Sequence, residues 1–426
     1  MSGPASASGS PRRSGQPQFD PFATIPYLSF LHRHKAKWIL VGYPIALILI
    51  ISMSASEGTL GSLDDFQIWV DIKRALGVAG QPDSEINFPV TRDLPSLILV
   101  FVIFLTMAIT IRQWTLMRET IPALLSSGAL VEKNAPSFST KHKLLGIEKL
   151  ISGKPAGVGG LAFLFDRINA GLRKIGSSSG WLVLLSGALA ILLMLGQTKN
   201  GVFVVVAPDN PPGGIHTWQT QAYASWWASI DHPGGFLVYI LLMFLGIYVV
   251  LIQNIVGLFA CYTLICLKAI ADFDLDWLNR DGEYGWKSVR DVYRTVIVSL
   301  ATHGLTISMV IVALGIANFP WMLGVVGIFA IMLPAATIIP LVVFSDLRAK
   351  ACKNRIALIT AQIAASPPSN PLLLSQYRAE IDQVNATKAN PLRLRALQLP
   401  PFLATVLLPI ILTALQLVVQ IRTSSK

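Results

Sequence analysis

The sequence predicts an all-α, polytopic membrane protein with seven transmembrane helices, its N-terminus in the cytoplasm and its C-terminus outside. Of its 426 residues, 53% are hydrophobic and only 13% are charged, which is far more apolar than a soluble domain. Several uncharged stretches approach the roughly 20 residues that a helix needs to cross a bilayer. Lys and Arg also gather in alternate loops, and the positive-inside rule places those loops in the cytoplasm.

Seven apolar stretches are the expected spans. They are residues 38–53, 95–111, 181–195, 235–256, 296–317, 321–344 and 402–421. No Asp, Glu, Lys or Arg falls within any of them. The first six are expected to form a membrane bundle over residues 38–344, and the seventh belongs to a C-terminal segment of span and tail, 399–426.

Charge assigns the remaining segments to opposite sides of the membrane. The expected cytoplasmic parts are a disordered basic N-terminus (1–37), two loops (112–180 and 268–295) and a helical segment (345–398). The expected extracytoplasmic parts are two caps (54–94 and 196–234). Most of the 34 Lys and Arg residues lie in the parts assigned to the cytoplasm, so the assignment agrees with the positive-inside rule throughout.

The fourth apolar stretch is unusually long, because Lys268 is the only charge between Gly235 and Ile270. As one helix it would reach about 54 Å, at 1.5 Å per residue, well beyond the membrane. A hairpin would also fit this length, but it would turn the basic segment 345–398 outward. We therefore expect one long helix that continues into the cytoplasm. Its inner part, which includes Leu258 and Tyr262, must then be covered by other protein.

Two amphipathic segments are expected to lie along the membrane surfaces. Apolar side chains recur at helical spacing beside Arg and Lys, and they are Leu161, Leu164, Phe165, Ile168, Leu172 and Ile175. A basic amphipathic helix of this kind is typical of the inner membrane surface. On the other side, Trp218, Tyr223, Trp226 and Trp227 predict a second interfacial helix, because indole and phenol rings favour the headgroup zone.

His303 is the one ionisable side chain within an expected span, and such groups usually face the bundle interior or water. It could line a pore, relay protons or bind a ligand, or it could be a neutral imidazole bonded to a neighbouring helix. The amides of Gln253, Asn254, Gln416 and Gln420 also lie in spans. They could bond helix to helix or line a permeation or substrate path.

The acidic stretch after the long helix resembles an EF-hand loop in part. Asp272, Asp274, Asp276 and Glu283 occupy positions one, three, five and twelve of that pattern. Position six, however, is Trp277 instead of the Gly that the sharp turn needs. A solvated turn is therefore favoured over a metal site, and no metal or other cofactor is expected. No catalytic motif is present, so the chain is not expected to be an enzyme.

The expected layout resembles that of the insect chemoreceptor channels. Shared features are seven spans, an internal N-terminus, a long fourth helix and a tight hairpin at 318–321. In the last span, Thr413 and Gln420 have that family's spacing, but Ala414 and Ile421 replace its two aromatic residues. No family is therefore assigned.

The most favoured function is that of a non-enzymatic channel or membrane sensor in the cell (inner) membrane. The alternatives are a secondary transporter, for which His303 and the prolines of span six speak, and a membrane scaffold without transport activity. The absence of carboxylates from the spans counts against proton-coupled transport. The expected partners are the lipid bilayer and, in a homo-oligomer, further copies of the chain. The net charge of +11 is attributed to the loops and not to nucleic-acid binding.

Overall fold

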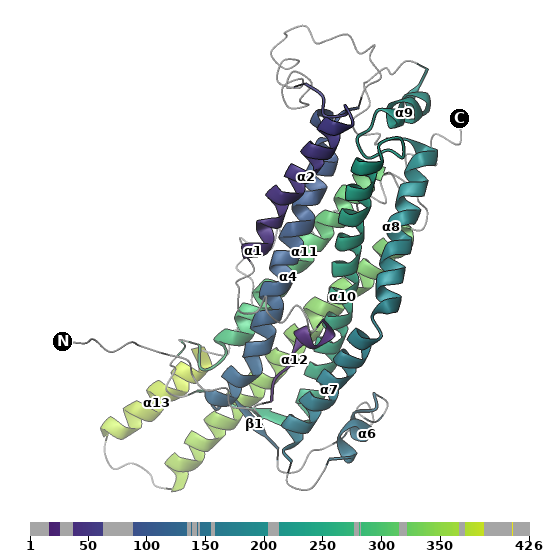
Figure 1. Ribbon diagram of the computed structural model, residues 1–426. Helices are drawn as coiled ribbons and strands as arrows, with labels where there is room; N and C mark the ends of the chain where they lie inside the picture. Colours follow the sequence, from purple (N-terminus) through teal and green to yellow (C-terminus); the bar gives the residue numbers. More distant parts are fainter. Residues whose placement is uncertain are drawn as a thin grey trace, which may run out of the picture.

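The computed structural model is built almost entirely of helices (Figure 1). It describes residues 17–25, 37–62, 88–133, 145–154, 158–202, 213–276, 283–314, 322–365 and 371–386, together with residues 138, 143, 281 and 411. The expected Gln416 and Gln420 lie outside these residues, as does most of the expected seventh span.

The long helices run roughly side by side along the molecule (Figure 1). They are α1 (Lys37–Leu40) with α2 (Gly42–Ser56), α4 (Leu94–Ser126), α8 (Gly180–Asn200), α10 (Pro233–Ile270), α11 (Lys287–Leu314) and α12 (Met322–Ala365). The shorter elements are the 3₁₀ helices η1 (Pro21–Thr24) and η4 (Val90–Arg92), the helices α6 (Ile147–Ser152), α7 (Gly160–Ser177), α9 (Ile215–Ala224) and α13 (Pro371–Ala386), and the strands β1 (Leu130–Glu132) and β2 (Ala271–Phe273). We call the two ends of the molecule the α9 end and the sheet end, after the elements that lie there.

Five helices in the described part of the chain are long and apolar enough to cross a membrane. They are Lys37–Ser56, Leu94–Ser126, Gly180–Asn200, Pro233–Ile270 and Val326–Ala365. Each overlaps one of the expected spans. The expected span at 296–317 is helical as far as Leu314, within α11. The chain is therefore a helical membrane protein with at least these five candidate spans.

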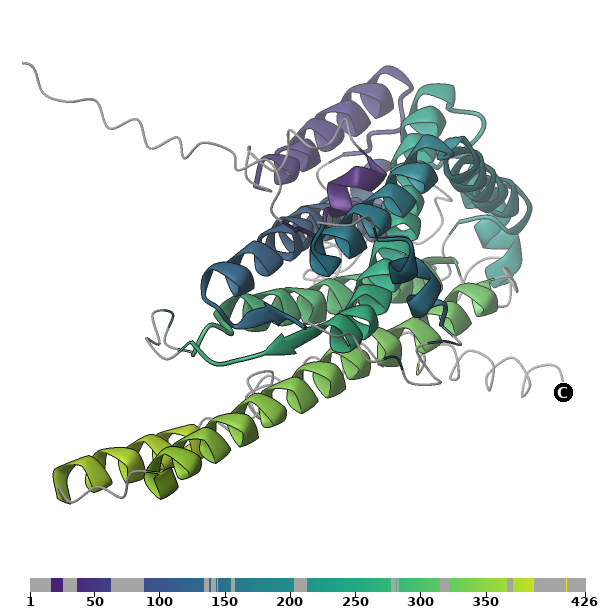
Figure 2. The ribbon, with the colours of Figure 1, turned by 90° about the horizontal axis from the view of Figure 1, so that it is seen from below.

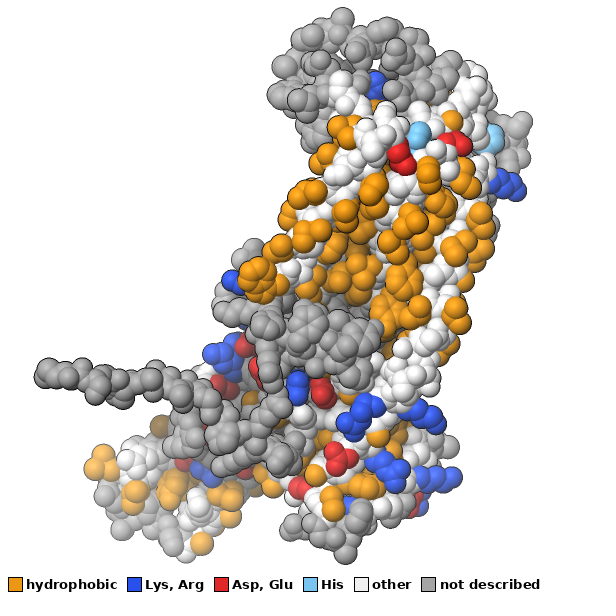
Figure 3. Space-filling view, viewed as in Figure 1, with side chains coloured by type: hydrophobic (Ala, Val, Ile, Leu, Met, Phe, Trp, Pro, Cys, Tyr) orange, Lys and Arg blue, Asp and Glu red, His pale blue; other side chains and the backbone are white. Residues whose placement is uncertain are grey.

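The outer surface near the α9 end carries a broad apolar belt (Figure 3). Apolar side chains point outward from several of the helices, and among the most exposed are Ile48 on α2, Leu184 on α8, Leu237 on α10 and Ile331 on α12. Charged side chains gather instead towards the sheet end, below this belt (Figure 3). An apolar belt of this extent is what a protein presents to lipid and not to water.

The long fourth stretch forms one uninterrupted helix, α10, and not a hairpin. Its 38 residues correspond to a length of about 57 Å. In its last part Cys266, Leu267 and Ile270 are buried in the core at the sheet end, and Tyr262 is partly covered by that core. Leu258 is the exception and remains about half exposed. The expected protein cover of the inner part is thus largely present.

Other helices also run further than the expected spans. The helix α4 continues through the first part of the expected loop 112–180, up to Ser126, and α11 begins at Lys287 instead of residue 296. The helix α12 continues to Ala365, and α13 packs back against it (Figure 2). Together these extensions build a helical body at the sheet end, where the sequence predicted a helical segment at 345–398 but loops at 112–180 and 268–295.

A two-stranded antiparallel sheet, absent from the all-α prediction, joins these helices. Leu130 pairs with Phe273 and Glu132 with Ala271. The carboxylate of Glu132 accepts hydrogen bonds from the first backbone N–H groups of α7. The ammonium of Lys133 donates to the carbonyl oxygens of Lys268 and Ala269 at the end of α10, at 2.9 and 3.3 Å. Both contacts satisfy helix-end groups that would otherwise lack partners.

Two expectations about the sheet end are wrong. The amphipathic helix α7 exists, but its apolar face, with Leu164, Phe165 and Leu172, is buried in protein instead of facing lipid. Part of that face is covered by η1 and part by α10. The N-terminal segment 1–37 was expected to be disordered, yet residues 17–25 are placed, with Phe22 and Ile25 almost fully buried.

Candidate functional site

A cavity of about 220 Å³ lies among α4, α10, α11 and α12. Most of its walls are hydrocarbon side chains. Its polar lining residues are Gln113, Thr120, Gln253, Asn254, Cys261, Thr263, Tyr293, Ser299 and His303. No Asp, Glu, Lys or Arg lines it among the residues that the structure describes. Three of the expected site residues, Gln253, Asn254 and His303, thus contribute to one cavity.

A buried polar network fixes one wall of this cavity. The indole of Trp114 on α4 donates to Oε1 of Gln253 on α10, at 2.7 Å. The Nε2 group of Gln253 donates in turn to Oε1 of Gln113, at 2.8 Å. The amide nitrogen of Gln113 then meets only the Sδ atom of Met117, at 4.0 Å, which is a weak acceptor. Gln253 therefore joins α4 to α10, and Gln113 retains donor capacity.

His303 is 5% exposed and lines the cavity from α11. Its Nδ1 atom lies 2.6 Å from the carbonyl oxygen of Ser299, one turn earlier. A carbonyl only accepts, so Nδ1 must carry the proton, and Nε2 of a neutral ring is then an acceptor. That Nε2 atom has no hydrogen-bond partner among the described residues. A buried acceptor without a donor is costly, so the ring adds an unmet hydrogen-bond requirement beside the cavity.

The position of the amides along their helices places them near one edge of the membrane. Gln113 follows the start of α4 by 19 residues, and Gln253 follows the start of α10 by 20. These spacings correspond to about 29 and 30 Å of helix, close to the hydrocarbon thickness of a bilayer, about 30 Å. The cavity therefore extends from the membrane-facing part of the bundle into the body at the sheet end.

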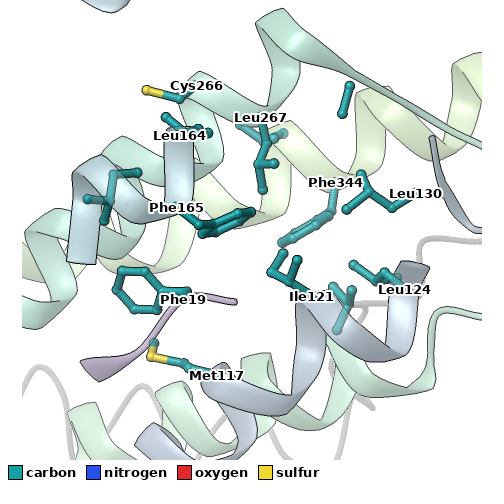
Figure 4. Packing of buried hydrophobic residues seen from close by; sticks show 14 of the residues in the cluster. Phe19, Met117, Ile121, Leu124, Leu130, Leu164, Phe165, Cys266, Leu267 and Phe344 are labelled. Atoms are coloured by element: carbon teal, nitrogen blue, oxygen red, sulfur yellow. The ribbon is translucent and has the colours of Figure 1, made fainter. Parts of the chain in front are cut away.

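Aromatic side chains line the cavity towards the sheet end. They are Phe19, Phe165, Phe273 and Phe344, and Figure 4 shows Phe19, Phe165 and Phe344 facing a common centre with Ile121 and Met117. At the opposite side, Ile328 on α12 lines the cavity and is also 59% exposed on the outer surface. Within the described part of the chain, the lining thus reaches from the lipid-facing surface to the core of the sheet end.

Residues 17–25, which we call the N-terminal segment, cover the cavity at the sheet end. Phe22 packs edge-on against Trp114, with ring centroids 5.5 Å apart. The backbone N–H of Asp20 donates to Oδ1 of Asn169 on α7, and Nδ2 of Asn169 donates to the carbonyl of Gln18, at 2.9 and 2.8 Å. Arg118 on α4 lies 3.7 Å from the carboxylate of Asp20. The segment therefore touches both the cavity and the residue that anchors Gln253.

A second polar cluster lies at the α9 end, around the carboxylate of Asp93. The indole groups of Trp226 and Trp227 donate to its Oδ2 atom, at 2.6 and 2.7 Å. Its Oδ1 atom accepts the backbone N–H of Ser96, at 3.1 Å, and so caps α4. Asp93 is fully buried. Burial raises the pKa of Asp93, while the three N–H donors favour the carboxylate and oppose that shift.

This cluster corrects the expectation of an interfacial aromatic helix at 218–230. Trp218 and Tyr223 lie on α9, as expected, but both rings are buried in protein together with Trp226 and Trp227. The aromatic rings therefore form a core between α9 and the starts of α4 and α10, instead of an anchor in the headgroups. Nearby, the carboxylate of Glu57 accepts the first N–H groups of α10, from Gly234 and Gly235, at 2.7 and 3.1 Å.

The acidic stretch after α10 does not converge on one point. Asp272 pairs with Lys350 at 2.7 Å and lies 3.9 Å from Lys133. Asp274 accepts the backbone N–H of Leu275, and Glu283 pairs with Arg290. Asp276 is buried. No three His, Cys, Asp or Glu side chains of the described residues lie close enough together to hold a metal ion.

The turn itself is organised by Asp281. Its Oδ1 atom accepts the backbone N–H groups of Glu283 and Gly285, at 2.8 and 2.9 Å. Its Oδ2 atom accepts the N–H of Lys287, the first residue of α11, at 2.9 Å. These carboxylate oxygens therefore accept hydrogen bonds from the backbone of the turn. Trp277, which replaces the Gly at position six of the EF-hand pattern, lies outside the described residues.

Sequence reasoning missed Gln113, Trp114 and Asp93. Gln113 and Trp114 follow Arg112, a charge that marks the end of the second expected span, although the helix continues. Asp93 falls in the expected extracytoplasmic cap because it is charged. The position of Asp93 in the sequence could have identified it, because an Asp immediately before an apolar helix with a Pro in its first turn is a typical N-cap.

The apolar belt, the long helices and the cavity define an α-helical membrane protein whose described residues form an uncharged, largely apolar cavity at one edge of the apolar belt. No known protein family, curated protein or solved structure matches the chain.

Proposed function

We propose that this protein is a non-enzymatic membrane sensor that binds a small, uncharged, largely apolar molecule in the cavity between α4, α10, α11 and α12. The observation that carries this proposal is the convergence of Gln253, Asn254 and His303 on a cavity otherwise walled by hydrocarbon. Small-molecule sites typically combine an apolar lining with a few polar groups that fix orientation. The sheet end is taken as cytoplasmic, in line with the positive-inside rule.

The chemistry of the lining limits the ligand class. A charged ligand would lose its hydration without gaining an opposite charge, which is strongly unfavourable. The Nε2 atom of His303 requires a hydrogen-bond donor, so a hydroxyl or N–H group on the ligand would match it. Asn254, with no hydrogen bond to the described residues, offers both donor and acceptor groups. A neutral hydrocarbon-rich alcohol, phenol or amide meets these requirements.

The size of the cavity agrees with such a ligand. An apolar cavity of about 150 Å³ is known to hold benzene, and the cavity here measures about 220 Å³. A substituted ring of that class also partitions into lipid, and the exposed Ile328 suggests entry from the bilayer. Because α4, α10 and α12 run without interruption from the apolar belt into the sheet end, a change in cavity packing would act directly on the body there.

The uncharged lining also separates this proposal from its alternatives. Ion channels and proton-coupled transporters commonly use charged or ionisable groups along their paths. Among the described lining residues, the only ionisable side chains are those of Cys261, Tyr293 and His303. This lining counts against an ion channel and a proton-coupled transporter. The experiment must separate the sensor from three rivals: a channel, a secondary transporter and a scaffold without transport.

The test uses the full chain in liposomes and a photoreactive probe, an aryl-diazirine benzyl alcohol. We expect labelling of cavity-lining peptides, mapped by mass spectrometry, and competition by 4-pentylphenol. His303→Leu and Asn254→Leu should each weaken the competition by roughly three- to tenfold, the usual effect of one hydrogen bond. Ile331→Ala, on the outer surface of α12, is the matched control and should leave it unchanged.

Flux measurements in the same liposomes decide between the classes. A sensor should pass no ions and accumulate no solute. Ion conductance would replace the sensor by a channel, and saturable, gradient-coupled uptake would replace it by a secondary transporter. Absence of flux together with absence of cavity labelling would leave the scaffold.

A further inference from the structure

The N-terminal segment is attached to the rest of the protein in an unusual way for buried residues. Phe19 and Phe22 are buried, yet η1 is only a four-residue 3₁₀ helix and not part of a longer element. Its contacts reach three helices that are distant in sequence, namely α4, α7 and α10. Such a short segment can leave its groove without breaking any helix of the bundle.

The same segment is placed where its departure would change the cavity. Phe19 contributes directly to the cavity wall, so its removal would open that wall at the sheet end. Phe22 supports the ring of Trp114, whose indole fixes Gln253. Undocking would therefore both open the cavity and release one constraint on its amide network.

Among the described residues, the segment is tied to the neighbouring helices by one ion pair and two side-chain hydrogen bonds. The ion pair between Asp20 and Arg118 spans 3.7 Å and both side chains are partly exposed, which makes it a weak attachment. The two hydrogen bonds with Asn169 involve the backbone of the segment. Docking thus depends mainly on burial of Phe19, Phe22 and Ile25.

We propose that the N-terminal segment, residues 17–25, is a detachable plug that closes the ligand cavity from the sheet end. It is held by its aromatic side chains in the groove between α4, α7 and α10. This regulation concerns the cavity of the proposed function and rests on it for its biological meaning. The opening itself is measurable without any ligand.

Two glycines provide a matched pair of substitutions. A Cβ atom at Gly176 would collide with the backbone carbonyl of Thr24, in the plug. A Cβ atom at Gly180, four residues later, meets nothing within 4 Å. Gly176→Ala should therefore displace the plug, whereas Gly180→Ala should leave it in place.

The readout is the reaction of Cys261, which lines the cavity and is half-buried, with a charged, membrane-impermeant maleimide, which reaches the cavity from water and not through the bilayer. The full chain in nanodiscs carries Cys266→Ala and Cys352→Ala, so that only one thiol reacts. We expect Gly176→Ala to raise the reaction rate about tenfold or more, in proportion to the population of the open state. Gly180→Ala should react at the rate of the unchanged background.

A second variant keeps the test decisive if Gly176→Ala does not displace the segment. Deletion of residues 1–25 should also accelerate the reaction of Cys261, and a synthetic peptide of residues 17–25 should slow it again. Equal rates in the deletion variant and the background would overturn the plug. That result would leave the labelling experiment with the diazirine probe intact, so failure of the plug and failure of the proposed function remain distinguishable.

Discussion

Replacement of Asp93 by Ala should strongly destabilise the α9 end of the molecule. The carboxylate receives two indole N–H groups and one backbone N–H group, all in a fully buried site. Asp93→Ala leaves all three donors without this acceptor. A buried donor that loses its partner costs about 1–3 kcal/mol, and loss of a helix N-cap costs roughly 1 kcal/mol.

The expected magnitude follows from these contacts. The two indoles alone predict a loss of about 2–6 kcal/mol in the free energy of unfolding. Removal of a buried charge offsets part of that loss, so about 3 kcal/mol is expected in total. Trp227→Phe removes one of three donors and should cost about 1 kcal/mol. Asp93→Asn, which keeps one carbonyl acceptor, should fall between the two.

The assay is unfolding of the purified protein in mixed micelles, followed by circular dichroism as sodium dodecyl sulfate is added. The reasoning would be refuted if Asp93→Ala matched the wild type within about 0.5 kcal/mol, which is the usual spread for neutral surface changes. It would also be refuted if Trp227→Phe cost more than Asp93→Ala, because the carboxylate would then not be the centre of the cluster.

The wild type and Asp93→Asn together give a pH dependence whose sign is fixed. Burial raises the pKa of Asp93 from its ordinary value of 3.8, so the folded protein binds this proton more tightly than the unfolded chain does. Stability contributed by the protonated group is present below that ordinary value and is lost as the pH rises through the folded pKa. The stability of the wild type relative to Asp93→Asn should therefore decrease over that interval. A constant difference from pH 3 upward would contradict the direction of the shift.

Three further predictions concern the cavity wall, the start of α10 and the topology. Gln253→Leu leaves the indole of Trp114 unpaired and should lower the free energy of unfolding by about 1–3 kcal/mol in the same micelle assay. Asn254→Leu, at the next position, should lower it by less than about 1 kcal/mol, because Asn254 has no hydrogen bond to the described residues. Equal losses would contradict the network. Gly235→Ala places a Cβ atom against the backbone carbonyl of Trp227 and should lower the melting temperature. Gly257→Ala should not, because no atom lies within 4 Å of its Cβ. A larger drop in melting temperature for Gly257→Ala than for Gly235→Ala would refute the close approach. In right-side-out vesicles, an impermeant maleimide should label His216→Cys and not Asn385→Cys, since the two positions lie at the α9 end and on α13; labelling of Asn385→Cys would reverse the proposed orientation.

The positions of the membrane helices were largely predictable, because hydrophobic length and charge act locally along the chain. The continuous helix α10 followed from the distribution of Lys and Arg in later loops. The extensions of α4 and α11 were missed because a charge such as Arg112 does not end a helix. A charged residue marks the point where a helix leaves the lipid. The backbone hydrogen bonds of the helix continue beyond that point, because the helix is then amphipathic and packs against protein.

The candidate site was predictable only in part. Polar residues in apolar spans singled out Gln253, Asn254 and His303, and all three line the cavity. Their partners Gln113 and Trp114 depend on packing between helices some 140 residues apart in sequence, which no local pattern encodes. An indole fits equally well in the headgroup zone and beside a buried carboxylate. The aromatic residues near Trp226 were therefore predicted to lie at the membrane surface, although they surround Asp93.

The position of the N-terminal segment has a consequence for the order in which the protein is built. Its groove needs α4, α7 and α10, so it is incomplete until Ile270 has been synthesised. At about 5–20 residues per second, the ribosome needs roughly 10–50 s to make that intervening stretch. During this time the groove for Phe19 and Phe22 lacks the last part of α10, although Trp114 and Asn169, which contact the segment, are made earlier.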